Sequence, residues 1–169
     1  MANYLGKRRR ELLMAWLEKA TPDQWHQVAD GWNWGSGEDP LRWIVSQPNC
    51  DRATALLIFW RAEPSYYWNG PSDKDGWKAS GKYFPEDLYD MLVEIVARWR
   101  AGGFIRSEID YLAEGGGDES DVSSSAKHPA LAITPDMGED IPGRIVTGLH
   151  EDGFEEGIPI EIVAATRGE

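Results

Sequence analysis

The densest group of acidic side chains lies near the carboxyl end of the chain and flanks a Gly-Phe pair. It consists of Glu151, Asp152, Glu155 and Glu156. Paired carboxylates can act as general acid and general base where a cleft separates their pKa values. Charged residues around a glycine turn are more often exposed to water. We therefore interpret these four residues as an exposed acidic turn, and as the place where a basic partner would dock.

A nucleophile or a metal site would have to come from one cysteine and three histidines. Cys50 precedes a predicted helix, a position that can lower the pKa of a thiol. His26, His128 and His150 lie in separate segments, so the sequence places no base beside the thiol. No His-x-x-x-His or Cys pair occurs, and no glycine loop of the phosphate-binding type. We expect Cys50 to be a packed residue, and we expect neither a metal nor a cofactor.

Negative charge is concentrated in the second part of the chain. Residues 1–103 contain 13 Lys and Arg against 14 Asp and Glu, whereas residues 104–169 contain 4 against 15, out of a net charge of −12. Such a field repels nucleic acid and anionic lipid and speeds the association of a basic protein. It also keeps a protein soluble, which is the simpler interpretation. The charge predicts no binding to nucleic acid or membranes, and favours a basic protein partner.

The cellular compartment follows from the apolar pattern and the cysteine content. No run of about 18 apolar residues occurs, and the basic cluster near the start is not followed by a signal-peptide core. A single cysteine cannot form an internal disulfide, which suits a reducing compartment. We expect a soluble, cytoplasmic protein.

About five helices are expected before residue 103. Three signals mark these helices: apolar residues at helical spacing, Thr or Asp before a proline at the start, and glycine at the end. They span residues 8–20, 22–30, 40–46 and 53–60, and then run from Pro85 to the Gly102-Gly103 pair. The segment 53–60 has no polar face and predicts a buried central helix, although a short apolar run can also form a buried strand. Residues 65–83 carry turn residues and predict a loop.

After residue 103 the apolar residues alternate, as in strands. We predict strands at 105–111, 130–133, 144–147 and 158–163, with a flexible Gly, Ser and Asp loop at 115–125. Helices followed by strands give an α+β fold: a helical block and then a small antiparallel sheet. The domain boundaries we predict are 1–112 for the tryptophan-rich helical part, 113–128 for an acidic loop, and 129–169 for an acidic extension packed on the first part.

All nine tryptophans lie between residues 16 and 99. Most are expected in the core, where the indole N–H finds a partner, but exposed tryptophans could form a binding platform. Trp32 and Trp34 lie in a Gly and Asn loop. They are therefore the pair we expect to be exposed.

The stretch around the central helix resembles a known family. It comprises Trp32-Asn33-Trp34, residues 40–45, the run from Pro48 to Trp60, Pro64 and Tyr66-Tyr67. Together these resemble the bacterial domain-of-unknown-function family 4274 over residues 25–111. The resemblance implies a bacterial origin and no catalytic residues. At the start of the helix, Asp51 and Arg52 either cap it or line a site.

Three functions stay open on the sequence. The first is a non-enzymatic binding module, such as an immunity protein that neutralises a cognate toxin, with Trp32, Trp34, Asp51, Arg52 and the acidic turn as candidate contacts. The second is an enzyme of unrecognised type with its site near Asp51, Arg52 and a loop tryptophan. The third is a module that associates with itself; the sequence does not give the oligomeric state.

Overall fold

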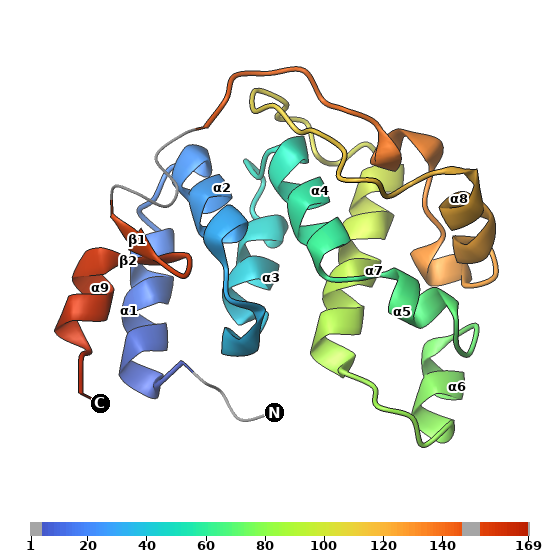
Figure 1. The fold of residues 1–169 in the computed structure, drawn as a ribbon, viewed down its shortest axis with the longest axis horizontal. Helices are drawn as coiled ribbons and strands as arrows, with labels where there is room; N and C mark the ends of the chain where they lie inside the picture. The colour runs from blue at the N-terminus through green and yellow to red at the C-terminus, as the bar shows by residue number, and fades with distance from the viewer. Residues whose placement is uncertain (1–4, 147–152, 169) are drawn as a thin grey trace.

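A computed structural model of the 169-residue chain describes residues 5–146 and 153–168. The fold is α+β, with helices through most of the chain and a two-stranded antiparallel sheet near its end (Figure 1). The helices up to residue 100 are α1 (Lys7–Leu17), α2 (Pro22–Gly31), the 3-10 turn η1 (Trp34–Ser36), α3 (Asp39–Ser46), α4 (Arg52–Arg61), α5 (Ser65–Trp68), α6 (Lys74–Ala79) and α7 (Glu86–Arg100). The later elements are α8 (Glu119–Ser125), the 3-10 turns η2 (Pro129–Leu131) and η3 (Pro135–Gly138), β1 (Phe154–Glu155), β2 (Ile158–Pro159) and α9 (Ile160–Ala165).

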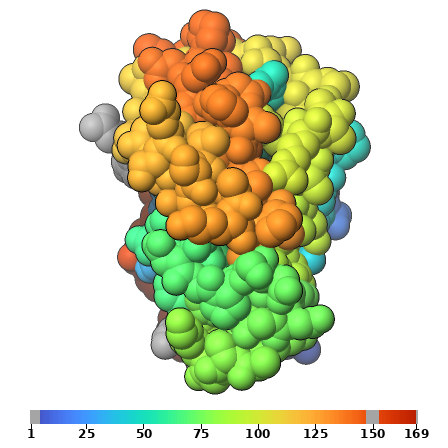
Figure 2. Space-filling model, turned by 90° about the vertical axis from the view of Figure 1, so that its right-hand side faces the viewer, coloured from blue at the N-terminus to red at the C-terminus, as the bar shows by residue number. Residues whose placement is uncertain are grey.

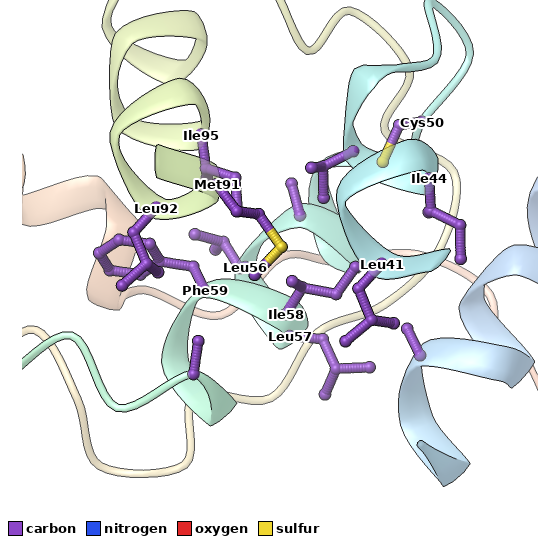
Figure 3. Close-up of a cluster of buried hydrophobic side chains, with 14 of the residues drawn as sticks. Leu41, Ile44, Cys50, Leu56, Leu57, Ile58, Phe59, Met91, Leu92 and Ile95 are labelled. Carbon is purple, nitrogen blue, oxygen red and sulfur yellow. The ribbon is translucent and has the colours of Figure 1, made fainter. Parts of the chain in front are cut away.

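Helix α4 is the centre of the core. Seven consecutive residues, Ala53 to Phe59, are buried, so the helix has apolar neighbours on every side. It packs against α2, α3 and α7, and Figure 3 shows its Leu56, Ile58 and Phe59 among side chains of α3 and α7. The predicted buried helix is therefore confirmed, and burial on all faces explains why it lacks a polar stripe.

Local residues fix the ends of the predicted helices. Thr21 and Gln24 form a reciprocal capping box at the start of α2, and Pro22 occupies the first helical position. Asp51 caps α4. The predicted loop at 65–83 is wrong, because it contains α5 and α6. Asp73 caps α6 by accepting a hydrogen bond from the Gly76 N–H at 2.7 Å, which stabilises a helix only six residues long.

The strand predictions after residue 103 are largely wrong. Residues 105–111 make isolated bridges only, because the N–H groups of Glu108 and Ile109 donate to the Asp51 carboxylate and not to a neighbouring strand. Residues 130–133 include part of the turn η2, which begins at Pro129. In 144–147, Arg144 makes one bridge and Thr147 lies outside the described residues.

Two further segments differ from the sequence prediction. The predicted flexible loop at 115–125 contains α8, which Asp118 caps by accepting from the Asp121 N–H. In 158–163 only the first two residues are a strand, and α9 follows. Ile158, Ile162 and Val163 are all buried, a spacing that suits a helix entered from a strand.

The second part of the chain packs along the helical block at two places. At one end, α9 lies against α1, and Arg9 donates a hydrogen bond to Thr166 at 2.7 Å. At the other end, α8 lies on α5, as Figure 2 shows with the gold and orange residues above the green ones. The indole N–H groups of Trp60 and Trp68 donate to the carbonyls of Met137 and Leu131. These bonds tie the tail to helices far away in the sequence.

Candidate functional site

The Trp32 loop and the acidic turn, which the sequence predicted separately, lie together. Asn33 donates from its side chain to Glu156 at 3.0 Å and from its backbone to the Glu156 carbonyl at 3.3 Å. A Cβ atom on Gly157 would lie 2.9 Å from the Trp32 Cα, so the turn fits closely over the loop. Glu155 and Glu156 are exposed there. Glu151 and Asp152 lie outside the described residues.

Trp32 is a core residue, which corrects the expectation that it is exposed. The residue is 6% exposed, and its indole N–H donates to the Gly37 carbonyl at 2.9 Å. Trp34 is half-buried and packs against the same core. The glycines around Trp32 and Trp34 correctly indicate a loop. The loop is not exposed as expected, because the hairpin of residues 153–159 covers it. The other tryptophans are likewise buried or packed against the core, in agreement with the interpretation that most are core residues.

Asp51 uses its carboxylate to join two parts of the chain. The side chain is buried and accepts from the Ala53 N–H at 3.0 Å, the Glu108 N–H at 2.8 Å and the Ile109 N–H at 3.3 Å. The Arg106 Nε atom lies 3.7 Å away. Because its carboxylate makes all these contacts, Asp51 holds the segment after α7 against the start of α4. Its role in the described residues is therefore structural.

Arg52, the first residue of α4, lies over an aromatic ring. Its guanidinium is 4.4 Å from the Trp99 ring centroid and 3.7 Å from Asp136, which also accepts from the Trp99 indole at 3.0 Å. Beside it is a small cavity of about 190 Å³, also lined by Arg100 and Phe104. Asp136 neutralises Arg52, and the Arg100 guanidinium donates to the carbonyls of Pro129 and Ala132, so both cations already have partners within the chain.

The cysteine and the two histidines within the described residues are buried and separate from one another. His26 and His128 contact Thr54 and Tyr89 through one ring nitrogen each, and burial lowers the pKa of both. His150 lies outside the described residues. Over residues 5–146 and 153–168, no three His, Cys, Asp or Glu side chains are grouped so that they could hold a metal ion. Neither histidine is placed to activate a substrate.

We predict that the Cys50 thiol is inert in the folded protein. The side chain is fully buried, and burial raises its pKa to about 12. At pH 8 the thiolate is then roughly one part in ten thousand, since each pH unit below the pKa changes the ratio tenfold. A chromogenic disulfide reagent should label the thiol only after urea is added. Rapid stoichiometric labelling without urea would contradict this.

An acidic cleft lies where the α4–α5 turn faces residues 114–121. Its volume is about 270 Å³, and it is lined by Trp60, Arg61, Glu63, Pro64, Ser65, Trp68, Glu114, Gly115, Gly116 and Asp121. Arg61, the only cation in that lining, pairs with Asp30 at 2.9 Å and Glu114 at 3.3 Å. Glu63 is exposed and forms no ion pair within the described residues. Three carboxylates against one already paired cation make this a site for positive charge.

Comparison with family models gives one match. Residues 20–93 match the model of a domain of unknown function, DUF4274. This segment, which is less than half of the chain, is similar to that family. The sequence resemblance covered residues 25–111. The match begins a few residues earlier, at residue 20, and ends before residue 111, at residue 93. No curated protein and no solved structure matches the chain.

The segment that matches the family model supplies only one wall of the acidic cleft. Trp60, Arg61, Glu63 and Trp68 lie within it, whereas Glu114, the glycines and Asp121 come from the chain beyond. Two further residues of the matched segment also bond to the chain beyond it: Trp60 donates to the Met137 carbonyl, and Asp51 accepts from the N–H groups of residues 108–109. No sequence spacing could reveal this cleft, because its walls are about fifty residues apart. Only Glu63-Pro64 after a predicted helix, and the Gly115-Gly116 pair, mark its edges as turns.

Glu63 occupies a strained position at the rim of the cleft. Its φ angle is +55°, in the left-handed region that favours glycine and follows the end of a helix. Glu63→Gly should raise the free energy of unfolding by a few tenths to about 1 kcal/mol, because relief of strain exceeds the added entropy of the unfolded chain. The matched control is Glu18→Gly. Glu18 also ends a helix, but at φ −59°, and this change should lower the free energy of unfolding. Urea denaturation compares the two, and equal losses would contradict the prediction.

Within the described residues, no helix is long and apolar enough to cross a bilayer. The longest, α7, has 15 residues and carries charges along one side.

Proposed function

We propose that this chain is a non-catalytic binding module that takes a basic protein on its acidic face. The observation that carries the proposal is the acidic cleft. Its carboxylates outnumber its cations, and Trp60 and Trp68 are among the residues that line it. A lysine or arginine side chain gains from carboxylates and aromatic rings together. The cleft is therefore suited to a cationic side chain from a partner.

The charges around the cleft extend the same field. Four more carboxylates near the cleft are exposed, and within the described residues none of them forms an ion pair. They belong to Asp118, Glu119, Glu139 and Asp140. Asp118 and Asp140 accept backbone hydrogen bonds, which hold their carboxylates in place. Fixed, unpaired carboxylates raise the rate at which a basic protein arrives.

The specific form that we propose is an immunity-type protein of the cytoplasm, which neutralises a basic toxin by covering its working surface. Support comes from the charge distribution and from the burial of Cys50, His26 and His128, which leaves the described residues without an accessible cysteine or histidine. The positions of Asp51 and Arg52 favour this over an enzyme, because both side chains are engaged in contacts within the chain.

The experiment is a toxicity rescue with a binding measurement. The proteins encoded beside this chain are expressed in a sensitive host, with and without the chain, and the affinity of each purified pair is measured. We expect one basic neighbour to be toxic alone, harmless with the chain, and bound to it. If no neighbour is toxic, or a toxic one is neither bound nor neutralised, the immunity function is wrong.

A further inference from the structure

Arg61 joins the acidic cleft to the end of a neighbouring helix. It is the last residue of α4, which packs beside α2 (Figure 1). Its Nη1 atom donates to the Asp30 carbonyl at 2.6 Å, near the end of α2. Its Nη2 atom lies 2.9 Å from the Asp30 carboxylate and donates to the Glu114 carboxylate at 3.3 Å. One guanidinium therefore contacts α2 on one side and a carboxylate of the cleft on the other.

The two contacts of Arg61 differ in strength. The last carbonyls of a helix have no partner within it, and a cation at a helix end is favoured by the helix dipole, so Asp30 offers a firm anchor. The Asp30 side chain is 21% exposed, whereas that of Glu114 is 59% exposed. Exposed ion pairs contribute little, because water competes for both charges. Arg61 can therefore release Glu114 at small cost while it stays bound to Asp30.

The contact with Glu114 occupies the cleft that a partner would enter. Three carboxylates line the cleft. Glu63 forms no ion pair in the part of the chain that the structure describes, and Asp121 accepts from the Gly117 N–H at 2.8 Å. Glu114 is the carboxylate that already has a cation. A cationic side chain that approaches Glu114 meets the like charge of Arg61, which opposes its binding.

We propose that Arg61 is an internal competitor at the acidic cleft. Its guanidinium occupies Glu114 in the free protein and remains on Asp30 alone when a cationic side chain of the partner takes that carboxylate. This inference rests on the proposed function and adds how affinity at the cleft is limited. A single cation that only replaces Arg61 gains little, so the contact selects a partner that presents several positive charges together.

A double-mutant cycle in the full chain tests the competition. Arg61→Met and Glu114→Gln are made singly and together, and calorimetry gives the affinity for an oligoarginine peptide at low salt. We expect Arg61→Met alone to raise the affinity about fivefold, the size of one exposed ion pair. Added to Glu114→Gln, the same change should raise it about twofold at most, because no carboxylate is freed. An equal gain in both backgrounds would overturn the inference.

Arg42→Met is the matched control for the change in net charge. Arg42 also lies between two carboxylates, those of Asp87 and Glu94, and it does not line the cleft. Its loss changes the total charge as Arg61→Met does and should raise the affinity only slightly. A gain equal to that of Arg61→Met would show that net charge alone acts, which also overturns the inference.

A measurement on the unchanged protein covers the case in which Arg61→Met does not fold. The NMR signal of the Arg61 Nε–H should shift as the peptide is added, while that of Arg42 stays constant. An Arg61 signal that stays constant at saturation overturns the inference, and the proposed function survives if the peptide binds in the cleft. If the peptide does not bind the unchanged protein at all, the proposed function itself is wrong.

Discussion

Replacing Asp51 by alanine is expected to lower the free energy of unfolding by about 4 kcal/mol, within the range for breaking a buried, hydrogen-bonded charge. The substitution removes the acceptor of three backbone N–H groups and leaves Arg106 beside an uncharged site. The buried N–H groups lose their partner without gaining water, so the full desolvation penalty remains. Equilibrium urea denaturation measures the loss.

Asp73→Ala is the matched control for Asp51→Ala. Asp73 also caps a helix, but it is exposed and bonds only within α6. Its loss should cost about 1 kcal/mol, the usual value for a helix cap. The difference between the two variants isolates the bonds from Asp51 to residues 108–109. If both variants lose the same free energy, Asp51 is only a cap and the account of how the two parts are joined is wrong.

Reversing two charges in the acidic cleft is expected to weaken binding of an oligoarginine peptide by about 100-fold at low salt. Glu63→Lys/Glu114→Lys turns the excess of carboxylates into an excess of cations, which repels the peptide and slows its association. Both side chains are exposed, so the fold should tolerate the change. Calorimetry at two salt concentrations gives the affinity, and the difference should shrink as salt rises.

Two comparison variants with the same net charge show where the peptide binds. Glu11→Lys/Glu18→Lys alters α1, in the nearly neutral part of the chain, and should weaken binding only a few-fold. Glu155→Lys/Glu156→Lys alters the acidic turn. The sequence analysis predicted that a basic partner docks there, and this stays a prediction. If the α1 variant weakens binding as much as the cleft variant, net charge alone determines affinity and the cleft has no particular role.

The sequence predicted the longer helices of the first part well because local residues determine them. Thr21, Gln24 and Pro22 fix the start of α2, and an unbroken apolar run marks α4. It failed where distant contacts decide the structure. Residues 105–111 alternate like a strand, yet two of their N–H groups bond to Asp51. Short helices capped by Asp73 and Asp118 are hidden among turn residues, because one cap stabilises six or seven residues that composition assigns to a loop.

The candidate site was the least predictable feature. Its walls meet because Trp60 donates to Met137, a contact across 77 residues, and because Gly117 and Gly138 pack backbone to backbone. Trp32 was assigned to an exposed loop because the hairpin that buries it lies more than a hundred residues away. Charge asymmetry was visible in the sequence, whereas the place where the carboxylates surround a cleft was not.

The most direct test of the acidic cleft as a binding site is a paired affinity purification from the native cells, with the unchanged chain and the Glu63→Lys/Glu114→Lys variant as baits. We expect a protein of basic isoelectric point that is retained by the unchanged chain, released by salt, and lost with the variant. That protein, once purified, should bind the unchanged chain directly. Partners that are acidic or neutral, or a basic partner held equally by both baits, would contradict the claim that the acidic cleft receives a basic protein.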